Sequence, residues 1–109
     1  MPPADRTLPS GTLTFLFTDI EGSTRLAHDL GTERFEDVLA YHGRVVRGAL
    51  EQAGGVSVRS EGDAFFYVFT RPTPAVTGAA EVERRLHTEP APHAATVRVR
   101  IGMHTGEVV

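Results

Sequence analysis

The sequence predicts an α+β fold in which two amphipathic helices lie on one face of a four-stranded antiparallel sheet. Strand-like and helix-like segments follow one another in the order βααββαβ. A tight turn, Glu61-Gly62-Asp63, joins two of the strands as a hairpin. Two longer segments repeat apolar residues at spacings of three and four, so each has one stripe to bury against the sheet. This is the order of a ferredoxin-like, or palm-like, α+β sandwich.

The composition is that of a soluble globular protein with a single core. The chain has 109 residues, of which 40% are hydrophobic and 23% charged, and its formal net charge is −3. That charge gives no reason to expect a nucleic acid or an anionic membrane as partner. A chain without Cys has no disulfide and no thiolate chemistry. No apolar run approaches the roughly 20 residues that span a bilayer, and the polar start lacks a signal-peptide core, so we expect a cytoplasmic protein without a membrane segment.

The first part of the chain is expected to hold a leader, a strand and a short helix. Residues 1–11 are polar and rich in Pro, which predicts a disordered leader before a folded unit at 12–109. Residues 12–18 are predicted to form a strand with apolar side chains on both faces, which is typical of a central position in a sheet. Residues 23–30 are predicted to form a short helix that Gly31 ends.

A long helix is predicted next, from Thr32 as its N-cap to about residue 53. Its apolar stripe consists of Phe35, Val38, Leu39, Val46, Ala49, Leu50 and Ala53. His42 falls on this stripe, where we expect a structural residue at the edge of the core. The hairpin follows, with strands at 56–60 and 64–69.

The last part of the chain is predicted to add one helix and one strand. Thr73 is expected to cap a helix whose first residue is Pro74. After a loop, residues 97–104 alternate apolar and polar side chains, which predicts a strand buried on one side only. Thr105-Gly106 is expected to turn the chain, so that the following residues would begin another strand.

Two carboxylates are predicted to meet at one edge of this sheet. In the ferredoxin-like order the first strand lies antiparallel to the third, which places Asp19 at the end of one strand beside Asp63 at the start of the other. Adjacent carboxylates repel each other unless a cation neutralises them, and such oxygen ligands suit Mg²⁺ or Mn²⁺. The following Gly22-Ser23-Thr24 opens a helix, where backbone N–H groups favour a phosphate. The alternative is that Asp19 only caps this helix and that Asp63 is a turn residue.

Three motifs carry a resemblance to a known family. They are FTDIEGST at residues 17–24, RSEGDAFF at 59–66 and RIGMHTGE at 100–107. In their order and spacing they resemble the class III adenylate/guanylate cyclase catalytic domain, over residues 12–109. The resemblance implies an enzyme of cyclic-nucleotide signalling that converts ATP or GTP to the 3′,5′-cyclic nucleotide and pyrophosphate. It also implies two bound metal ions, Mg²⁺ or Mn²⁺.

The resemblance implies roles for particular residues. Asp19 and Asp63 match the two metal-binding Asp of the family, and the backbone carbonyl of Ile20 matches a further metal ligand. The turn that follows matches the phosphate-binding segment, which here consists of Glu21, Gly22, Ser23 and Thr24. Arg59 stands where many members carry a base-recognising Lys. Because a planar guanidinium differs in geometry from an ammonium, the choice between ATP and GTP stays open.

Other groups of the family's active site are expected to come from elsewhere. In the family, a second base-selecting residue and the Asn and Arg that stabilise the transition state lie beyond the segment matching residues 102–109. The site itself forms between the two subunits of a head-to-tail dimer. The resemblance therefore implies a partial catalytic domain, truncated after RIGMHTGE, that binds metal and nucleotide. A homodimer would lack the missing groups at both sites, so full activity would need a partner cyclase domain or the missing C-terminal portion.

Two other functions fit the same pattern. A palm-like sheet with two acids is also typical of polymerases and diguanylate cyclases, although the hairpin lacks the GG[DE]EF pattern of the latter. A catalytically silent nucleotide-binding or dimerisation module of a larger regulator fits as well. Arg98 and Arg100, on the polar face of the last strand, are most simply a solvated or dimer-facing surface.

Overall fold

The computed structural model of the chain describes residues 11–108. The expected disordered leader falls on residues 1–10, which lie outside the described residues, whereas Gly11 already belongs to the first strand. The elements are β1 (Gly11–Ile20), α1 (Ser23–Leu30), α2 (Thr32–Gln52), β2 (Val56–Glu61), β3 (Ala64–Phe69), α3 (Pro72–Thr88), the short 3₁₀ helix η2 (Pro92–Ala94) and β4 (Val99–Val108). Apart from η2, this is the predicted order.

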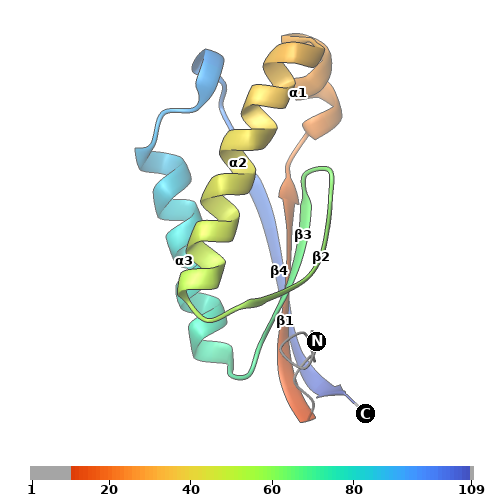
Figure 1. Cartoon of the computed structure of the whole chain (residues 1–109), viewed down its shortest axis with the longest axis vertical. Coiled ribbons are helices and arrows are strands. Elements are labelled where there is room, and N and C mark those ends of the chain that lie inside the picture. Colours follow the sequence, from red (N-terminus) through yellow and green to blue (C-terminus); the bar gives the residue numbers. More distant parts are fainter. Residues whose placement is uncertain (1–10, 109) are drawn as a thin grey trace, which may run out of the picture.

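The four strands form one antiparallel sheet in the order β2-β3-β1-β4. Helices α2 and α3 lie side by side on one face of the sheet, and α1 lies beyond its end, next to the start of α2 (Figure 1). β1 therefore occupies the central position that its two apolar faces predict, with β3 on one side and β4 on the other. The predicted α+β sandwich is confirmed.

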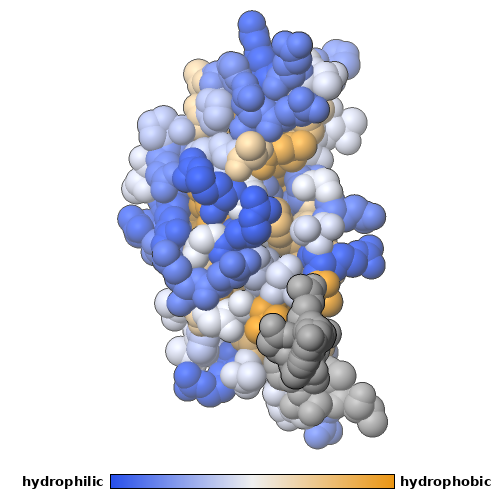
Figure 2. All heavy atoms as spheres, viewed as in Figure 1, coloured by the Kyte–Doolittle hydropathy of each residue, from blue (hydrophilic) through white to orange (hydrophobic). Residues whose placement is uncertain are grey.

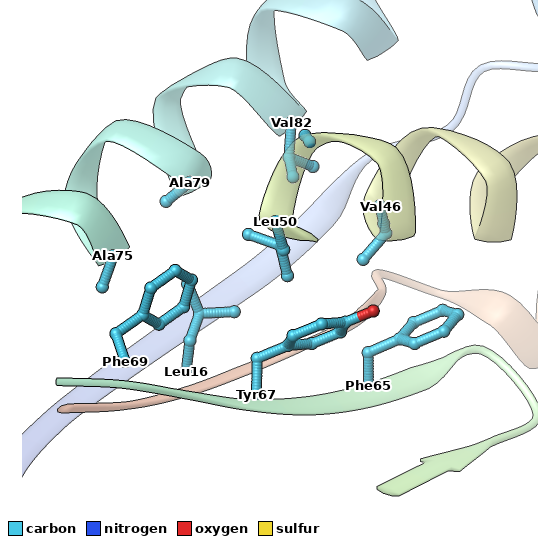
Figure 3. Close-up of a cluster of buried hydrophobic side chains, with 10 residues drawn as sticks. Leu16, Val46, Leu50, Phe65, Tyr67, Phe69, Ala75, Ala79 and Val82 are labelled. Carbon is cyan, nitrogen blue, oxygen red and sulfur yellow. The ribbon is translucent and has the colours of Figure 1, made fainter. Parts of the chain in front are cut away.

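The core lies between the sheet and the two long helices. The strands contribute Leu16, Phe65, Tyr67 and Phe69, whose side chains point toward the helices (Figure 3). The helices contribute Val46, Ala49, Leu50, Ala75, Ala79 and Val82. Gly78 lets α3 approach α2 closely, because a Cβ there would stand 3.0 Å from Cδ2 of Leu50.

Both predicted side-chain caps of the long helices are wrong. The N-cap of α2 is Gly31, with a φ of 86°, and Thr32 is the first helical residue. α3 begins at Pro72, after Arg71, and neither helix has a side-chain hydrogen bond at its cap. Proline has a fixed φ that fits the first helical position, which accounts for the earlier start of α3.

The predicted turn at Thr105-Gly106 is also wrong. β4 runs without a break to Val108, because its pairing with β1 continues until Val108 stands opposite Gly11. Within this ladder the hydroxyl groups of Thr14 and Thr105 meet at 2.9 Å. The described part of the chain therefore ends within β4, and residues 107–108 do not begin a fifth strand.

The position of His42 differs from the expectation as well. This residue is 1% exposed and lies inside the core, not at its edge. Hydrophilic side chains cover most of the outer surface of the helices, and apolar ones are visible between them in the middle of the molecule (Figure 2). In the part of the chain that the structure describes, no helix is long and apolar enough to span a bilayer.

Candidate metal and nucleotide site

Asp19 is the last residue but one of β1, and its side chain is mostly buried. In the β1–β4 ladder it stands opposite Arg100. The guanidinium of Arg100 donates two hydrogen bonds to the carboxylate, from Nε to Oδ1 at 2.9 Å and from Nη2 to Oδ2 at 2.7 Å. The hydrogen bond and the charge of Asp19 both raise the pKa of Arg100 above its ordinary value. The negative charge of Asp19 is thus balanced by the guanidinium of Arg100.

Asp63 lies in the turn of the β2–β3 hairpin and reaches the end of β1. Gly62 before it has a φ of 60°, a conformation that favours glycine. Oδ2 of Asp63 accepts a hydrogen bond of 2.7 Å from the backbone N–H of Ile20. Thr18 pairs with Phe65 in the β1–β3 ladder, and the same register continued by two residues brings Ile20 beside Asp63. The structure therefore brings Asp19, Ile20 and Asp63 together at one edge of the sheet.

The hydrogen bond of the Ile20 N–H also indicates the direction of the Ile20 carbonyl group. The N–H and C=O of one residue in an extended strand point to the same side. Since the N–H of Ile20 points toward Asp63, its carbonyl faces that side too. The carbonyl that the family resemblance implies as a metal ligand therefore lies on the side of Asp63.

The segment after β1 forms the start of α1. The backbone N–H of Glu21 is engaged, because it donates to the carbonyl of Arg98 at 2.7 Å. Gly22 is the N-cap with a φ of 67°, and its carbonyl accepts the first helical bond from Leu26 at 3.0 Å. The N–H groups of the first helical turn, which begins at Ser23, have no acceptor within the helix. They are the groups that can bind a phosphate oxygen.

A cavity of about 300 Å³ connects the start of α1 to the hairpin turn. Its lining consists of Ser23, Thr24, Ala27, Phe35, Leu39, Gly62 and Asp63. A larger hollow of about 640 Å³ lies between α3 and the loop before β4, and neither Asp19 nor Asp63 lines it. We place the candidate phosphate site at the smaller cavity, because the carboxylate of Asp63 and free helical N–H groups meet there. Asp19 and Ile20 are not among its lining residues.

Arg59 is not among the residues that line this cavity. It lies on the edge strand β2, opposite Phe66 of β3. Its guanidinium stands 5.7 Å from the centre of the Phe66 ring, and Nη2 is 3.5 Å from Oε1 of Glu61. Arg59, the candidate for base recognition, therefore contacts residues of its own hairpin.

The donor set fits metal ions that share their coordination with a substrate. Within residues 11–108 no group of three or more His, Cys, Asp and Glu side chains is arranged so that it could hold a metal ion by itself. Mg²⁺ typically keeps several waters and is held by one or two carboxylates together with substrate phosphates. Asp19 and Asp63 supply two such carboxylates beside Ile20, at the strand end that leads to α1. Both oxygens of Asp19 accept hydrogen bonds from Arg100 in this structure.

Arg100 is the residue whose role the sequence interpretation missed. Alternation along β4 indicated that its side chain lies on the polar face, which is correct. It could not show which residue of β1 stands opposite, because the register between two strands that are distant in sequence depends on the assembled sheet. The sequence signal for this contact would have been an expected ion pair between Arg100, in the motif RIGMHTGE, and Asp19, in the motif FTDIEGST.

Comparison with known proteins identifies the family. A family model described as the adenylate and guanylate cyclase catalytic domain matches residues 7–109. An uncharacterised protein of Mycobacterium tuberculosis is 39% identical over 102 residues, which cover 92% of this chain and 33% of that protein. An adenylate cyclase of Neurospora crassa is 36% identical over 80 residues, covering 73% of this chain and 3% of that protein. The chain belongs to the adenylate and guanylate cyclase catalytic domain family.

Solved structures support the same fold. The guanylate cyclase domain of Catenaria anguillulae in complex with GTP superposes with a TM-score of 0.81 at 21% identity, over 92% of this chain and 59% of that one. An adenylate cyclase from Trypanosoma brucei in its monomeric state gives a TM-score of 0.75 at 27% identity, over 93% of this chain and 58% of that one. The chain thus spans 33% of its mycobacterial relative and less than two thirds of either solved cyclase chain.

Proposed function

We propose that this chain holds the metal ions and the triphosphate in a class III nucleotidyl cyclase, which converts ATP or GTP to a 3′,5′-cyclic nucleotide and pyrophosphate. The observation that carries the proposal is the hydrogen bond from the N–H of Ile20 to Asp63, which brings Asp63 to the end of β1 directly after Asp19. The chain that carries this arrangement belongs to the cyclase family. A nucleoside triphosphate as substrate is consistent with a cytoplasmic protein.

The residues of the site would divide the binding between them. Asp19, Asp63 and the carbonyl of Ile20 would hold two Mg²⁺ or Mn²⁺ ions. Bound there, the ions would supply Lewis acidity and lower the pKa of the attacking ribose hydroxyl. The first turn of α1, from Ser23, would orient the phosphates. The fork of Arg100 fits a phosphate as well as a carboxylate, so Arg100 is a further candidate for phosphate binding.

Base recognition and transition-state stabilisation would require a second domain. Arg59 is the only base-recognition candidate among the described site residues, and it is held by Phe66 and Glu61. We therefore propose that full activity requires a dimer with a partner cyclase domain, because a second copy of this chain would lack the same groups. One cyclase domain of the same fold, from Blastocladiella emersonii, has been described as a non-canonical dimer, and another structure of it as a monomer.

A second candidate function is a catalytically silent nucleotide-binding or dimerisation module. The observation that favours it is the two-point contact of Arg100 with Asp19, which occupies both oxygens of a proposed metal ligand. In such a module the Arg100–Asp19 pair would be permanent, and nucleotide would bind without the metal ions.

Thermal-shift titration with ATP, GTP and Mn²⁺ separates the two candidates. The cyclase proposal expects nucleotide to stabilise the chain only with Mn²⁺, and expects Asp19→Asn and Asp63→Asn to abolish that stabilisation. Glu61→Gln is the matched control, because it removes one charge from an exposed side chain of the same hairpin. Stabilisation that survives both Asn substitutions would favour the silent module. Assayed with Mn²⁺ and ATP or GTP, the chain alone is expected to form little cyclic nucleotide.

A further inference from the structure

Three buried polar atoms in the described core have no hydrogen-bond partner in the protein. They are Oγ1 of Thr18 and both ring nitrogens, Nδ1 and Nε2, of His42. Thr18 is 0% exposed and His42 is 1% exposed, so bulk water does not reach them. A buried polar group without a partner is strongly disfavoured in a folded protein. Neutral imidazole needs one acceptor and one donor, and a hydroxyl can serve as either.

The two residues lie at the same level of the core. Thr18 pairs with Phe65 across the β1–β3 ladder, so their side chains share one face of the sheet. The ring of His42 stands 5.7 Å from the ring of Phe65. His42 lies one helical turn before Val46, which packs over Phe65 and Tyr67 (Figure 3). A four-residue step along a helix, about 6 Å, matches a two-residue step along a strand, about 6.7 Å, so both residues lie beside Phe65.

A hydroxyl and an imidazole without partners are unusual in a core that is otherwise apolar. The neighbouring levels of the same helix and strands carry aliphatic and aromatic side chains, such as Val46, Leu16 and Tyr67. Internal water typically occupies sites where buried polar groups lack other partners, and it makes two to four hydrogen bonds there. His42 is held neutral by its surroundings, since burial lowers its pKa to about 4. A neutral ring presents one donor and one acceptor to such a water.

We propose that Thr18 and His42 hold an internal water molecule between α2 and β1, directly behind the strand end that carries Asp19. The water bridges Oγ1 of Thr18 and a ring nitrogen of His42. It ties helix α2 to the strand residue just before the acid. The proposal rests on the fold alone and does not depend on the proposed catalytic function.

Two measurements on the folded chain test the proposal. In NMR spectra of the wild type, we expect magnetisation transfer from a long-lived water to the Thr18 methyl group and to the His42 ring. A double-mutant cycle with Thr18→Val and His42→Phe is expected to be non-additive. If the two single substitutions acted independently, their effects on the unfolding equilibrium constant would multiply. We expect the unfolding equilibrium constant of the double variant to be at least about fivefold smaller than that product predicts.

Thr14→Val is the matched control for the cycle. Thr14 is also a buried Thr of β1, but its hydroxyl is paired with that of Thr105. Combined with His42→Phe, it should give effects that multiply to within about twofold. Additive behaviour of Thr18 and His42 would overturn the proposal. So would a wild-type spectrum without the water signal, since coupling alone would then indicate a direct bond between the two side chains.

Discussion

Asp19 and Arg100 face each other across the β1–β4 ladder and are joined by two hydrogen bonds, of 2.9 and 2.7 Å. The pair neutralises one of the two carboxylates that meet at this edge of the sheet, and so relieves the repulsion that two adjacent negative charges would produce. It also places a cation where a metal ion is proposed to bind. Under the proposed function, a metal ion would therefore compete with Arg100 for Asp19.

The first prediction follows from that competition. Arg100→Gln is expected to increase the affinity for Mn²⁺ alone, by up to about fivefold, because the exposed guanidinium no longer occupies Asp19. The same variant is expected to bind Mn²⁺ with ATP or GTP less tightly, because a candidate phosphate ligand is lost. Isothermal titration calorimetry measures both. Arg84→Gln, on the exposed surface of α3, is the control that removes one positive charge far from the site. An unchanged Mn²⁺ affinity would argue against Asp19 as a ligand.

The second prediction concerns the bond from the N–H of Ile20 to Asp63, at 2.7 Å. Asp63→Ala leaves this N–H without its acceptor and should lower the free energy of unfolding by about 1–2 kcal/mol. Urea denaturation measures the change. Glu61→Ala, which truncates an exposed acid of the same hairpin, should change it by less than about 0.5 kcal/mol. Equal stability of the two variants would mean that the Asp63 contact does not hold the hairpin against β1.

Much of this arrangement could be predicted from the sequence, and for a physical reason. The hairpin around Gly62 is local, and the alternation of side chains along a strand decides which of its residues face the helices. Those two facts, with the expected strand order, were enough to place Asp63 beside the end of β1. The caps at Thr32 and Thr73 failed because a neighbouring Gly and Pro supplied the required backbone geometry instead.

The long-range part of the site could not be predicted in the same way. The partner of Arg100 depends on the register of β4 against β1, which is decided by contacts between residues far apart in the sequence. The continuous pairing of β4 to Val108 overrode a Thr-Gly pair that is typical of turns. His42 lies on an apolar stripe, and the pattern alone does not distinguish the edge of a core from its interior.

The third prediction is a dependence of stability on pH that arises from His42. Burial lowers its pKa to about 4, and the nearby charges of Asp63 and Asp19 oppose this lowering while that of Arg47 adds to it. Between about pH 6.5 and 4 the unfolded state binds a proton that the folded state does not, so stability falls as the pH falls through this range. Between pH 7.5 and 5 the contribution is about 2 kcal/mol.

Urea denaturation of the wild type and of His42→Phe across this pH range isolates that contribution. Both proteins share the titration of the carboxylates, so the difference between their curves reports His42. The difference is expected to grow in favour of His42→Phe as the pH falls. Parallel curves would show that His42 titrates alike in the folded and unfolded states.

The fourth prediction concerns Gly22, the N-cap of α1, whose φ is 67°. No atom lies within 4 Å of a Cβ built at this position, so a substitution there meets strain in the backbone and no steric clash. Gly22→Ala should lower the free energy of unfolding by about 1 kcal/mol, and Gly22→Asn by less, because Asn tolerates the left-handed region. Thermal unfolding compares the two variants. Equal losses for Ala and Asn would indicate that the backbone angle is not the cause.

The central claim is that Asp19 and Asp63 bind the metal ions, and the most direct test is the number of Mn²⁺ ions bound per chain. Equilibrium dialysis in the presence of saturating ATP or GTP measures it. We expect about two ions for the wild type and for Glu61→Gln, as in two-metal phosphoryl chemistry. We expect a clear loss for both Asp19→Asn and Asp63→Asn. The same number of bound ions in both Asn variants as in the wild type would contradict the claim.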